Sequence, residues 1–331
     1  MAGVSDRVRL GRSELSVSPI AFGTWQLGGE WGRFDEDRAV KAIRRARELG
    51  INFFDTAQAY GFGASERLLA RALDQELRDA RDDVVIATKG GLRPVAGGAA
   101  RDSSPAFLRD GVDRSLEALG VDHIDLYQLH WPDPDTPLAE TGAALAALRD
   151  AGKIRHVGVS NFSAAQMEEL SQALTVETLQ PPYHLFNREI EDEVLPWCLD
   201  NDVGVLVYGP LAHGLLTGAI EPHGEFADDD WRSGSPMFSE PNLTRNLEVV
   251  RQLGEVADEL GCTLSQLAIA WTLVHPAVHV AIVGSRNPDH IAEAVEALDV
   301  ELDEGDLQRI VTIMQGAVGA EGPSPEMNTR D

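Results

Sequence analysis

Four polar residues that could do acid–base chemistry stand at or just after the ends of expected buried strands. Asp55 closes the segment INFFD, Lys89 closes VVIATK, His130 closes IDLYQLH, and Tyr60 follows Asp55 by five residues. A buried aspartate or lysine needs a partner or a task, because an unpaired charge is costly to desolvate. Together, an acid, a phenol, an ammonium and an imidazole are the parts of a tuned proton donor. They predict a site that reduces a carbonyl group.

Strand and helix patterns alternate eight times along the chain, and this alternation determines where the four residues lie. Near-continuously apolar strands that alternate with amphipathic helices are typical of parallel strands covered by helices. We therefore expect a (β/α)8 TIM barrel, whose strand C-termini all open onto one catalytic face. The expected strands are residues 19–23, 52–55, 84–89, 124–130, 154–160, 177–180, 203–209 and 278–284.

An open, doubly wound α/β sheet is the alternative fold. Such a sheet usually carries a glycine-rich turn after its first strand, and residues 22–25 show no such pattern. The nearest lookalike, at residues 61–63, has Glu66 where a third glycine would stand. The barrel is therefore the expected fold.

The remaining segments fit a single domain of residues 1–331. We expect an N-terminal β-hairpin that turns at residues 11–13, and extra helices near 246–260 and 264–274. A long insert at 211–245 is of the kind that often covers a ligand. The composition of residues 316–331 is typical of a disordered tail.

The formal net charge is −26, and the chain has only three lysines. A charge of this sign disfavours binding to nucleic acid or to an anionic membrane. A saline habitat and the compositional bias of a GC-rich genome both remain open as its cause. The expected partner is a small molecule, and the sequence leaves the oligomeric state unknown.

Targeting and cysteine signals indicate a cytoplasmic protein. No run of 18 apolar residues occurs, and the first ten residues lack the apolar core of a signal peptide. Cys198 and Cys262 lie far apart without CxxC spacing, as expected for free thiols in a reducing compartment. His275 and His279 are separated by Pro276, which disfavours the helix that an i, i+4 metal site would need, so we expect no metal.

Several longer motifs carry a resemblance to a known family. They are FFDTAQAYGFGASERLL, VVIATKGG, IDLYQLHWPDP, GKIRHVGVSNF, YGPLAHGLLTG and IVGSRNPDHI. On these stretches the chain resembles an aldo-keto reductase, from the hairpin to about residue 314. The subgroup with HWPDP after the fourth strand, found in bacteria, is the most similar.

The resemblance implies that Asp55, Tyr60, Lys89 and His130 form the catalytic tetrad. Tyr60 would give a proton to the carbonyl oxygen as hydride arrives from a nicotinamide. A phenol titrates near about 10, and the neighbouring ammonium of Lys89 would bring it closer to neutral pH. Asp55 would hold Lys89 by pairing with it, and His130 would orient the carbonyl and stabilise the developing oxyanion.

The resemblance also implies a bound nicotinamide cofactor. Ser160, Asn161 and Gln180 would hydrogen-bond the carboxamide, and Tyr208 would stack on the ring. Further expected cofactor residues are Thr24 at the end of the first strand and the pyrophosphate loop residues Gly209, Pro210, Leu211 and Gly214.

The segment after the eighth strand would bind the adenosine end. Ser285 and Arg286 stand where the family binds a 2′-phosphate, and arginine suits a phosphate. Gly284 and His290 occupy positions that are basic in many members, and Glu293 matches an adenine contact. The helix that opens at residues 287–288 can also favour a phosphate at its N-terminus. We therefore expect NADPH rather than NADH.

Aromatic residues are expected to form the substrate pocket. Trp25, Trp131 and Tyr60, with Trp231 and Phe238 of the insert, would suit an apolar aldehyde or ketone. The expected activity is NAD(P)H-dependent reduction of an aldehyde or ketone to an alcohol. Two alternatives remain: a nucleotide-binding regulatory subunit similar to the barrel subunits of potassium channels, and a purely structural barrel.

Overall fold

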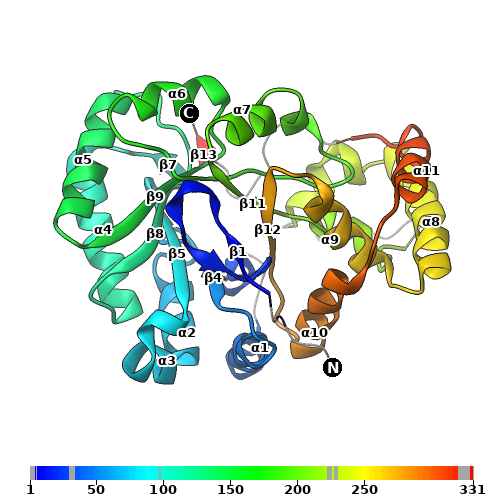
Figure 1. The fold of residues 1–331 in the computed structure, drawn as a ribbon, viewed down its shortest axis with the longest axis horizontal. Coiled ribbons are helices and arrows are strands. Elements are labelled where there is room, and N and C mark those ends of the chain that lie inside the picture. The colour runs from blue at the N-terminus through cyan, green and yellow to red at the C-terminus, as the bar shows by residue number, and fades with distance from the viewer. Residues whose placement is uncertain are drawn as a thin grey trace.

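Eight parallel strands close into a barrel (Figure 1), in the order β10-β11-β12-β3-β4-β5-β8-β9. The computed structural model describes residues 4, 6–29, 34–96, 98–221, 226, 230–319 and 329–330. The barrel strands are β3 Ile20–Gly23, β4 Phe53–Asp55, β5 Val85–Gly90, β8 Ile124–Leu129, β9 Ile154–Ser160, β10 Thr178–Gln180, β11 Gly204–Tyr208 and β12 Val278–Val283. The predicted (β/α)8 barrel is confirmed.

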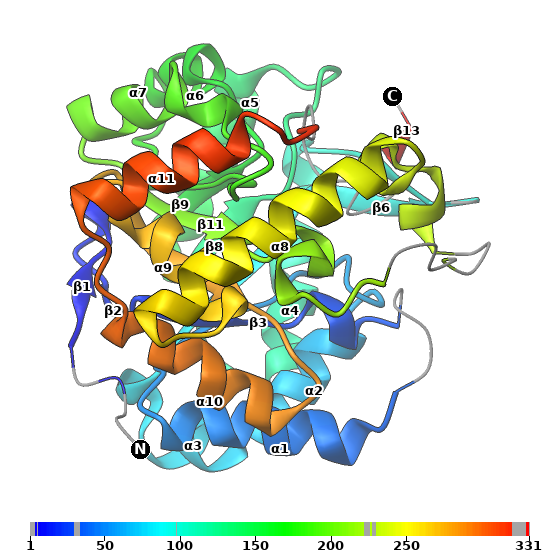
Figure 2. The same ribbon diagram turned by 90° about the vertical axis from the view of Figure 1, so that its right-hand side faces the viewer.

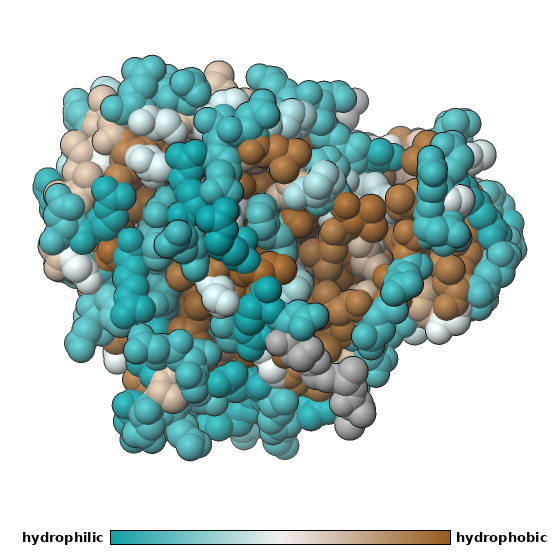
Figure 3. All heavy atoms as spheres, viewed as in Figure 1, coloured by the Kyte–Doolittle hydropathy of each residue, from teal (hydrophilic) through white to brown (hydrophobic). Residues whose placement is uncertain are grey.

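Helices surround the barrel and connect its strands. They are α1 Glu36–Glu48, α2 Ala64–Ala72, α3 Asp74–Asp79, α4 Pro105–Leu119, α5 Leu138–Asp150, α6 Ala164–Ser171, α7 Val194–Asp200, α8 Asn242–Leu260, α9 Leu264–Val274, α10 Pro288–Glu296 and α11 Glu304–Met314. Figure 2 shows α8 and α11 packed side by side outside the ring. On the face drawn in Figure 3, hydrophilic residues cover most of the helices, and hydrophobic ones gather beside β12 and α9.

Alternation along the strands gives the molecule two apolar cores. In β4, Phe53 packs inside the barrel with Leu126 and Leu206, whereas Phe54 packs outward in the cluster that includes the helices. The hairpin of β1 (Val8–Arg9) and β2 (Ser16–Val17) adds Leu10 and Val17 to the inner core. Because these side chains fill the inner core at the N-terminal end of the strands, the functional groups lie at the opposite end.

A second hairpin, which was not predicted from the sequence, follows β5. Strands β6 (Leu92–Val95) and β7 (Gly98–Arg101) pair antiparallel beside the C-terminal ends of the barrel strands. The glycines and the proline in residues 90–98 hide the apolar alternation that usually indicates strands.

The prediction that the tail is disordered is wrong for residues 316–319. The Asn246 side chain donates to the Val318 carbonyl at 3.1 Å and accepts from the Val318 amide at 2.8 Å, which fixes this segment against α8. Strand β13 (Thr329–Arg330) pairs with β7. The rest of the tail lies outside the described residues.

Candidate active site

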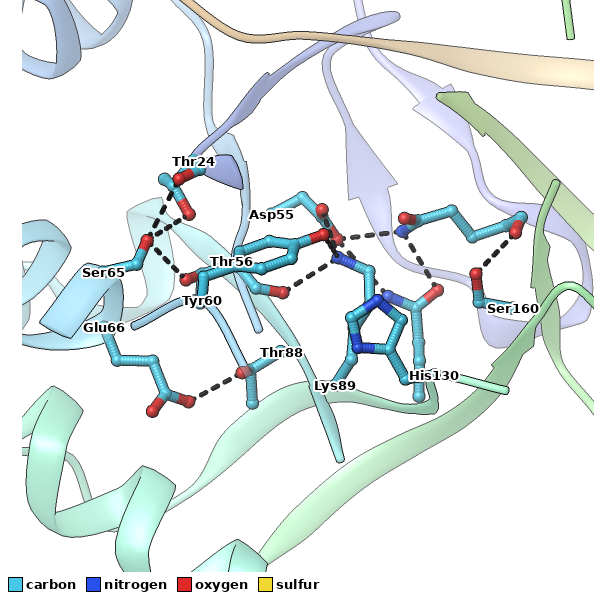
Figure 4. Close-up of polar contacts among 12 residues, drawn as sticks. Thr24, Asp55, Thr56, Tyr60, Ser65, Glu66, Thr88, Lys89, His130 and Ser160 are labelled. Atoms are coloured by element: carbon cyan, nitrogen blue, oxygen red, sulfur yellow. Dashed lines mark hydrogen bonds and ion pairs between the residues drawn. The ribbon is translucent and has the colours of Figure 1, made fainter. Parts of the chain in front are cut away.

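Lys89 lies inside the barrel between Asp55 and Tyr60 (Figure 4). Its Nζ donates to Asp55 Oδ1 at 2.6 Å, to the Thr56 carbonyl at 2.9 Å and to the Tyr60 hydroxyl at 3.3 Å. The lysine is fully buried, and Asp55 and Tyr60 are at most 3 % exposed. A charge buried this deeply needs a close counter-ion, and Asp55 provides it.

The second oxygen of Asp55 is also occupied. Oδ2 accepts from Gln180 Nε2 at 2.9 Å and from Gln128 Nε2 at 3.4 Å. With both oxygens bound, the carboxylate has one orientation. Gln128 was missed by the sequence analysis, although a polar residue two positions before His130 in a buried strand is a usable signal, because such residues share a face.

His130 follows β8 and packs against the tyrosine. Its ring meets the Tyr60 ring edge to face, with centroids 5.7 Å apart and an interplanar angle of 80°. The His130 backbone amide donates to the Gly90 carbonyl at 2.9 Å. The structure thus brings all four predicted catalytic residues together at the C-terminal ends of β4, β5 and β8.

Polar contacts connect the ends of the next three strands. Ser160 Oγ donates to the Gln180 carbonyl at 2.8 Å, and the Tyr208 hydroxyl donates to Asn161 Oδ1 at 2.9 Å. Asn161 has φ of 62°, a left-handed conformation that asparagine tolerates better than most residues. These contacts fix the positions of Gln180 and Tyr208 relative to the tetrad.

One elongated cavity of about 570 Å³ begins at Asp55 and Tyr60 and extends across the C-terminal face. It passes the loop after β11 and ends beside α10. The predicted residues in its wall are Trp25, Gln180, Tyr208, Gly209, Pro210, Leu211, Gly214, Gly284, Ser285, His290 and Glu293. Gln26, His213, Thr217 and Arg232 line it too, and the sequence analysis had not singled them out.

The loop after β11 turns sharply where it lines the cavity. Ala212, His213 and Gly214 have φ of 48°, 55° and 99°. Non-glycine residues with positive φ are uncommon and are kept only where surrounding contacts hold them. Here the Trp231 ring packs edge to face on His213 at 4.8 Å, and Arg232 Nη1 donates to the His213 carbonyl at 3.2 Å.

Trp231 and Arg232 of the long insert therefore pack on this loop. Arg232 contributes to the cavity wall, whereas Trp231 and Phe238 do not line it. Phe238 is buried, and its ring lies 6.1 Å from that of Trp231. The two aromatic residues expected near the substrate instead pack behind the wall.

Seven predicted site residues are not among those that line the cavity: Thr24, Lys89, His130, Trp131, Ser160, Asn161 and Arg286. The Thr24 hydroxyl accepts from Ser65 Oγ at 2.7 Å. Trp131, expected to line the substrate pocket, is not among the residues that line this cavity. It packs beneath the second hairpin with Ala59, Leu92 and Ala99, under the guanidinium of Arg101 at 5.2 Å.

Arg286 points toward the segment after β3. Its Nε and Nη2 donate to the Gln26 carbonyl at 3.0 and 2.6 Å, and the guanidinium lies 4.7 Å from the centre of the Phe34 ring. Burial lowers the pKa of the guanidinium. Beside it, Ser285 Oγ lies 3.4 Å from His290 Nδ1, and both residues line the cavity.

Among the described residues, no group of three or more His, Cys, Asp or Glu side chains is placed to hold a metal ion. In the same part of the chain, no helix is long and apolar enough to cross a membrane.

A closed barrel with an acid, a lysine, a tyrosine and a histidine at one rim defines an oxidoreductase site of a known kind. The chain belongs to the Aldo/keto reductase family, whose model matches residues 19–315. It is therefore an oxidoreductase that reduces carbonyl compounds with a nicotinamide cofactor.

Named relatives cover nearly the whole chain. The aldo-keto reductase YhdN of Bacillus subtilis is 40% identical over 306 residues, which cover 92% of each chain. The NADH-specific methylglyoxal reductase of Escherichia coli is 34% identical and covers 91% of this chain and 95% of its own. The structure of glycerol dehydrogenase AKR11B4 from Gluconobacter oxydans superposes with a TM-score of 0.88 at 36% identity, covering 97% of this chain and 98% of that one.

Proposed function

We propose that Tyr60 is the proton donor in the reduction of an aldehyde or ketone. The observation that carries this proposal is the position of Lys89 Nζ, which contacts both Asp55 Oδ1 and the Tyr60 hydroxyl inside the barrel. As the proton moves from Tyr60 to the carbonyl oxygen, the adjacent ammonium stabilises the phenolate that remains. Asp55 keeps Lys89 charged and in place.

His130 has the second role at the carbonyl. Its ring packs edge to face against that of Tyr60, which places it beside the end of the cavity that Tyr60 lines. A ring N–H aimed there orients the carbonyl and stabilises negative charge on its oxygen as the carbon is reduced. Tyr60 and His130 together position one oxygen atom, which suits a single carbonyl group.

The residues of the cavity fit an extended dinucleotide. Gln180 offers an amide, and Tyr208 offers an aromatic face beside the tetrad. Gly209 and Gly214 have φ of 68° and 99°, so their backbone comes close to the cavity without a side chain. When bound, the nicotinamide supplies the hydride. Ser160 and Asn161 would act behind this wall by holding Gln180 and Tyr208, and Thr24 by fixing the loop that carries Trp25.

We propose that NADPH is preferred over NADH. Ser285 and His290 offer a hydroxyl and an imidazole at the far end of the cavity, beside the N-terminus of α10. Arg286 neighbours them, and its contact with a neutral carbonyl is weaker than a guanidinium–phosphate pair. A 2′-phosphate would therefore draw Arg286 away from Gln26. Glu293 would face the adenine.

The substrate class follows from the cavity wall near the tetrad. Trp25 lines it beside Tyr60, so an apolar group on the carbonyl carbon would be accommodated. We also infer a reducing, cytoplasmic location, because Cys198 and Cys262 are both free.

Titration with both nucleotides, followed by turnover on a panel of aldehydes and ketones, tests this function. We expect protein fluorescence to change at lower concentrations of NADPH than of NADH, and NADPH to be oxidised in the presence of a carbonyl substrate. Tight binding without turnover on any substrate would favour a regulatory nucleotide-binding subunit instead.

A further inference from the structure

A second polar cluster lies outside the barrel wall, between α2, α4, β5 and β8. Four of its side-chain atoms are buried and make no hydrogen bond to any described residue: Gln58 Oε1, Glu66 Oε2, Ser115 Oγ and Tyr127 OH. These residues are between 0 and 6 % exposed. Because buried polar atoms in native proteins nearly always have partners, four orphans in one region indicate a shared partner.

Two of the four atoms lie together beside Gly111 of α4, and the residues of the other two are close by. A Cβ atom at position 111 would lie 3.2 Å from Gln58 Oε1 and 3.5 Å from the Tyr127 hydroxyl. Ser115 follows Gly111 by one helical turn, and so lies on the same face. Its hydroxyl is close enough to Glu66 to lower the pKa of that carboxyl, and the pKa of Tyr127 is raised by burial and, to a smaller extent, by the charge of Glu66.

The donors and acceptors in this cluster balance. Glu66 Oε2 and Gln58 Oε1 can only accept, whereas Ser115 and Tyr127 each carry a hydroxyl that can donate. One water molecule donates two hydrogen bonds and accepts two, and buried waters typically bridge such atoms. A single water within hydrogen-bond distance of all four atoms would satisfy them.

This cluster contacts the catalytic residues through the backbone of β5. Thr88 Oγ1 donates to Glu66 Oε1 at 2.7 Å, and Thr88 is the residue before Lys89 (Figure 4). On the other side of Lys89, a Cβ at Gly90 would lie 1.8 Å from the Tyr127 hydroxyl, so the phenol packs directly against the strand. The Gln58 backbone N–H donates to the Lys89 carbonyl at 3.0 Å.

We propose that Glu66, together with an internal water held by Gln58, Ser115 and Tyr127, is a positioning unit for Lys89 and Tyr60. It fixes the backbone on both sides of Lys89 and places a carboxylate behind the strand that carries the ammonium. The proposal rests on the function proposed above, because it assigns Glu66 a role through Lys89.

The surroundings of Glu66 act on its pKa in opposite directions. Burial has the largest effect and leaves the pKa of the carboxyl raised, although the hydroxyls of Thr88 and Ser115 and the charges of Arg67 and Lys89 each lower it. Tyr127 and Arg114 are the other titratable groups at the cluster. An ionised Glu66 stabilises the ammonium of Lys89 and disfavours the phenolate of Tyr60 at high pH.

The pH dependence of kcat/KM tests the charge effect. Glu66→Gln keeps the shape and an acceptor for Thr88 but removes the negative charge. The Tyr60 phenolate then forms more readily, so we expect the alkaline limb to move to lower pH by about half a unit, with KM little changed. Glu177→Gln, at the opposite end of the barrel beside Val157, is the matched control and should leave the limb in place. An unmoved limb in Glu66→Gln, or an equal shift in the control, would overturn the charge effect.

The water site is tested without any assay of activity. Tyr127→Phe removes only the hydroxyl, so we expect a lower Tm because the bridging water loses a donor. A raised or unchanged Tm would mean that the hydroxyl has no partner, and the site would be wrong. A high-resolution crystal structure of the unmodified protein should show an ordered water within hydrogen-bond distance of at least three of the four atoms. Absence of this water would overturn the proposed water site even if the variants failed to fold. An inactive wild-type protein in which the water is present would overturn the proposed function alone.

Discussion

The Lys89 ammonium lies 2.6 Å from Asp55 Oδ1, and neither side chain is more than 4 % exposed. Asp55 is held in turn by Gln180 and Gln128, so the lysine has one position relative to Tyr60. This relationship makes the charge on Lys89 the feature on which the proposed proton transfer depends.

Replacing Lys89 with methionine should abolish most activity. Removal of the ammonium takes away the charge that stabilises the Tyr60 phenolate, so we expect kcat to fall by about 10²-fold or more. Asp55 is also left as a buried charge without its partner, which should destabilise the protein by about 3–5 kcal/mol. Steady-state kinetics and denaturant unfolding measure the two effects.

Lys153→Met is the control for that experiment. Lys153 pairs with Asp113 at the surface, where an ion pair contributes less than about 1 kcal/mol. It should change neither kcat nor the free energy of unfolding appreciably. Equal losses in the two variants would mean that the Lys89–Asp55 pair has no special role.

The cofactor preference should depend on Arg286. In Arg286→Ala the charge beside Ser285 and His290 is lost, so we expect the Kd for NADPH to rise by about tenfold or more, as for one charge-assisted hydrogen-bonded contact. The Kd for NADH should change little, because it has no 2′-phosphate. Fluorescence titration measures both constants, and a parallel rise in the two would contradict a phosphate contact.

Asp133 should make stability depend on pH. Its carboxylate accepts from the Ser103 amide, the Asp135 amide and the Thr136 hydroxyl at 2.7–3.0 Å, and these bonds outweigh burial and lower its pKa. A lowered folded-state pKa gives stability that is present above the unfolded-state pKa and is lost as pH falls through the folded-state value. Asp133→Asn should therefore cost about 2 kcal/mol at neutral pH and progressively less in acid.

Unfolding of Asp133→Asn across the acid range measures this trend. The exposed Asp135→Asn is the control and should follow the wild type. A cost that stays constant down to the most acidic pH would show that the charge of Asp133 is not responsible.

The barrel fold and the positions of the residues at its strand ends could be predicted from the sequence. Asp55, Lys89 and His130 each end a buried segment, and parallel strands in a barrel must bring such ends together. The directions in which the Trp131 and Arg286 side chains point could not be predicted from strand ends. The first depends on the glycine-rich hairpin that covers it, and the second on the backbone carbonyl of Gln26.

Gln128 and Glu66 were not predicted as site residues, for a different reason. Gln128 lies within a strand and not at its end. Glu66 stands where a dinucleotide-binding motif would have a third glycine, and nothing else in the sequence indicated its role. The role of each depends on which side of the barrel wall it faces, and that is visible only once β4, β5 and β8 are paired.

The Tyr60→Phe variant tests the central claim most directly. It removes one hydroxyl and keeps the ring that packs on His130. With a carbonyl substrate identified for the wild type, we expect kcat to fall by at least about 10²-fold while the Kd for NADPH stays within about twofold. An unchanged kcat would contradict the assignment of Tyr60 as the proton donor.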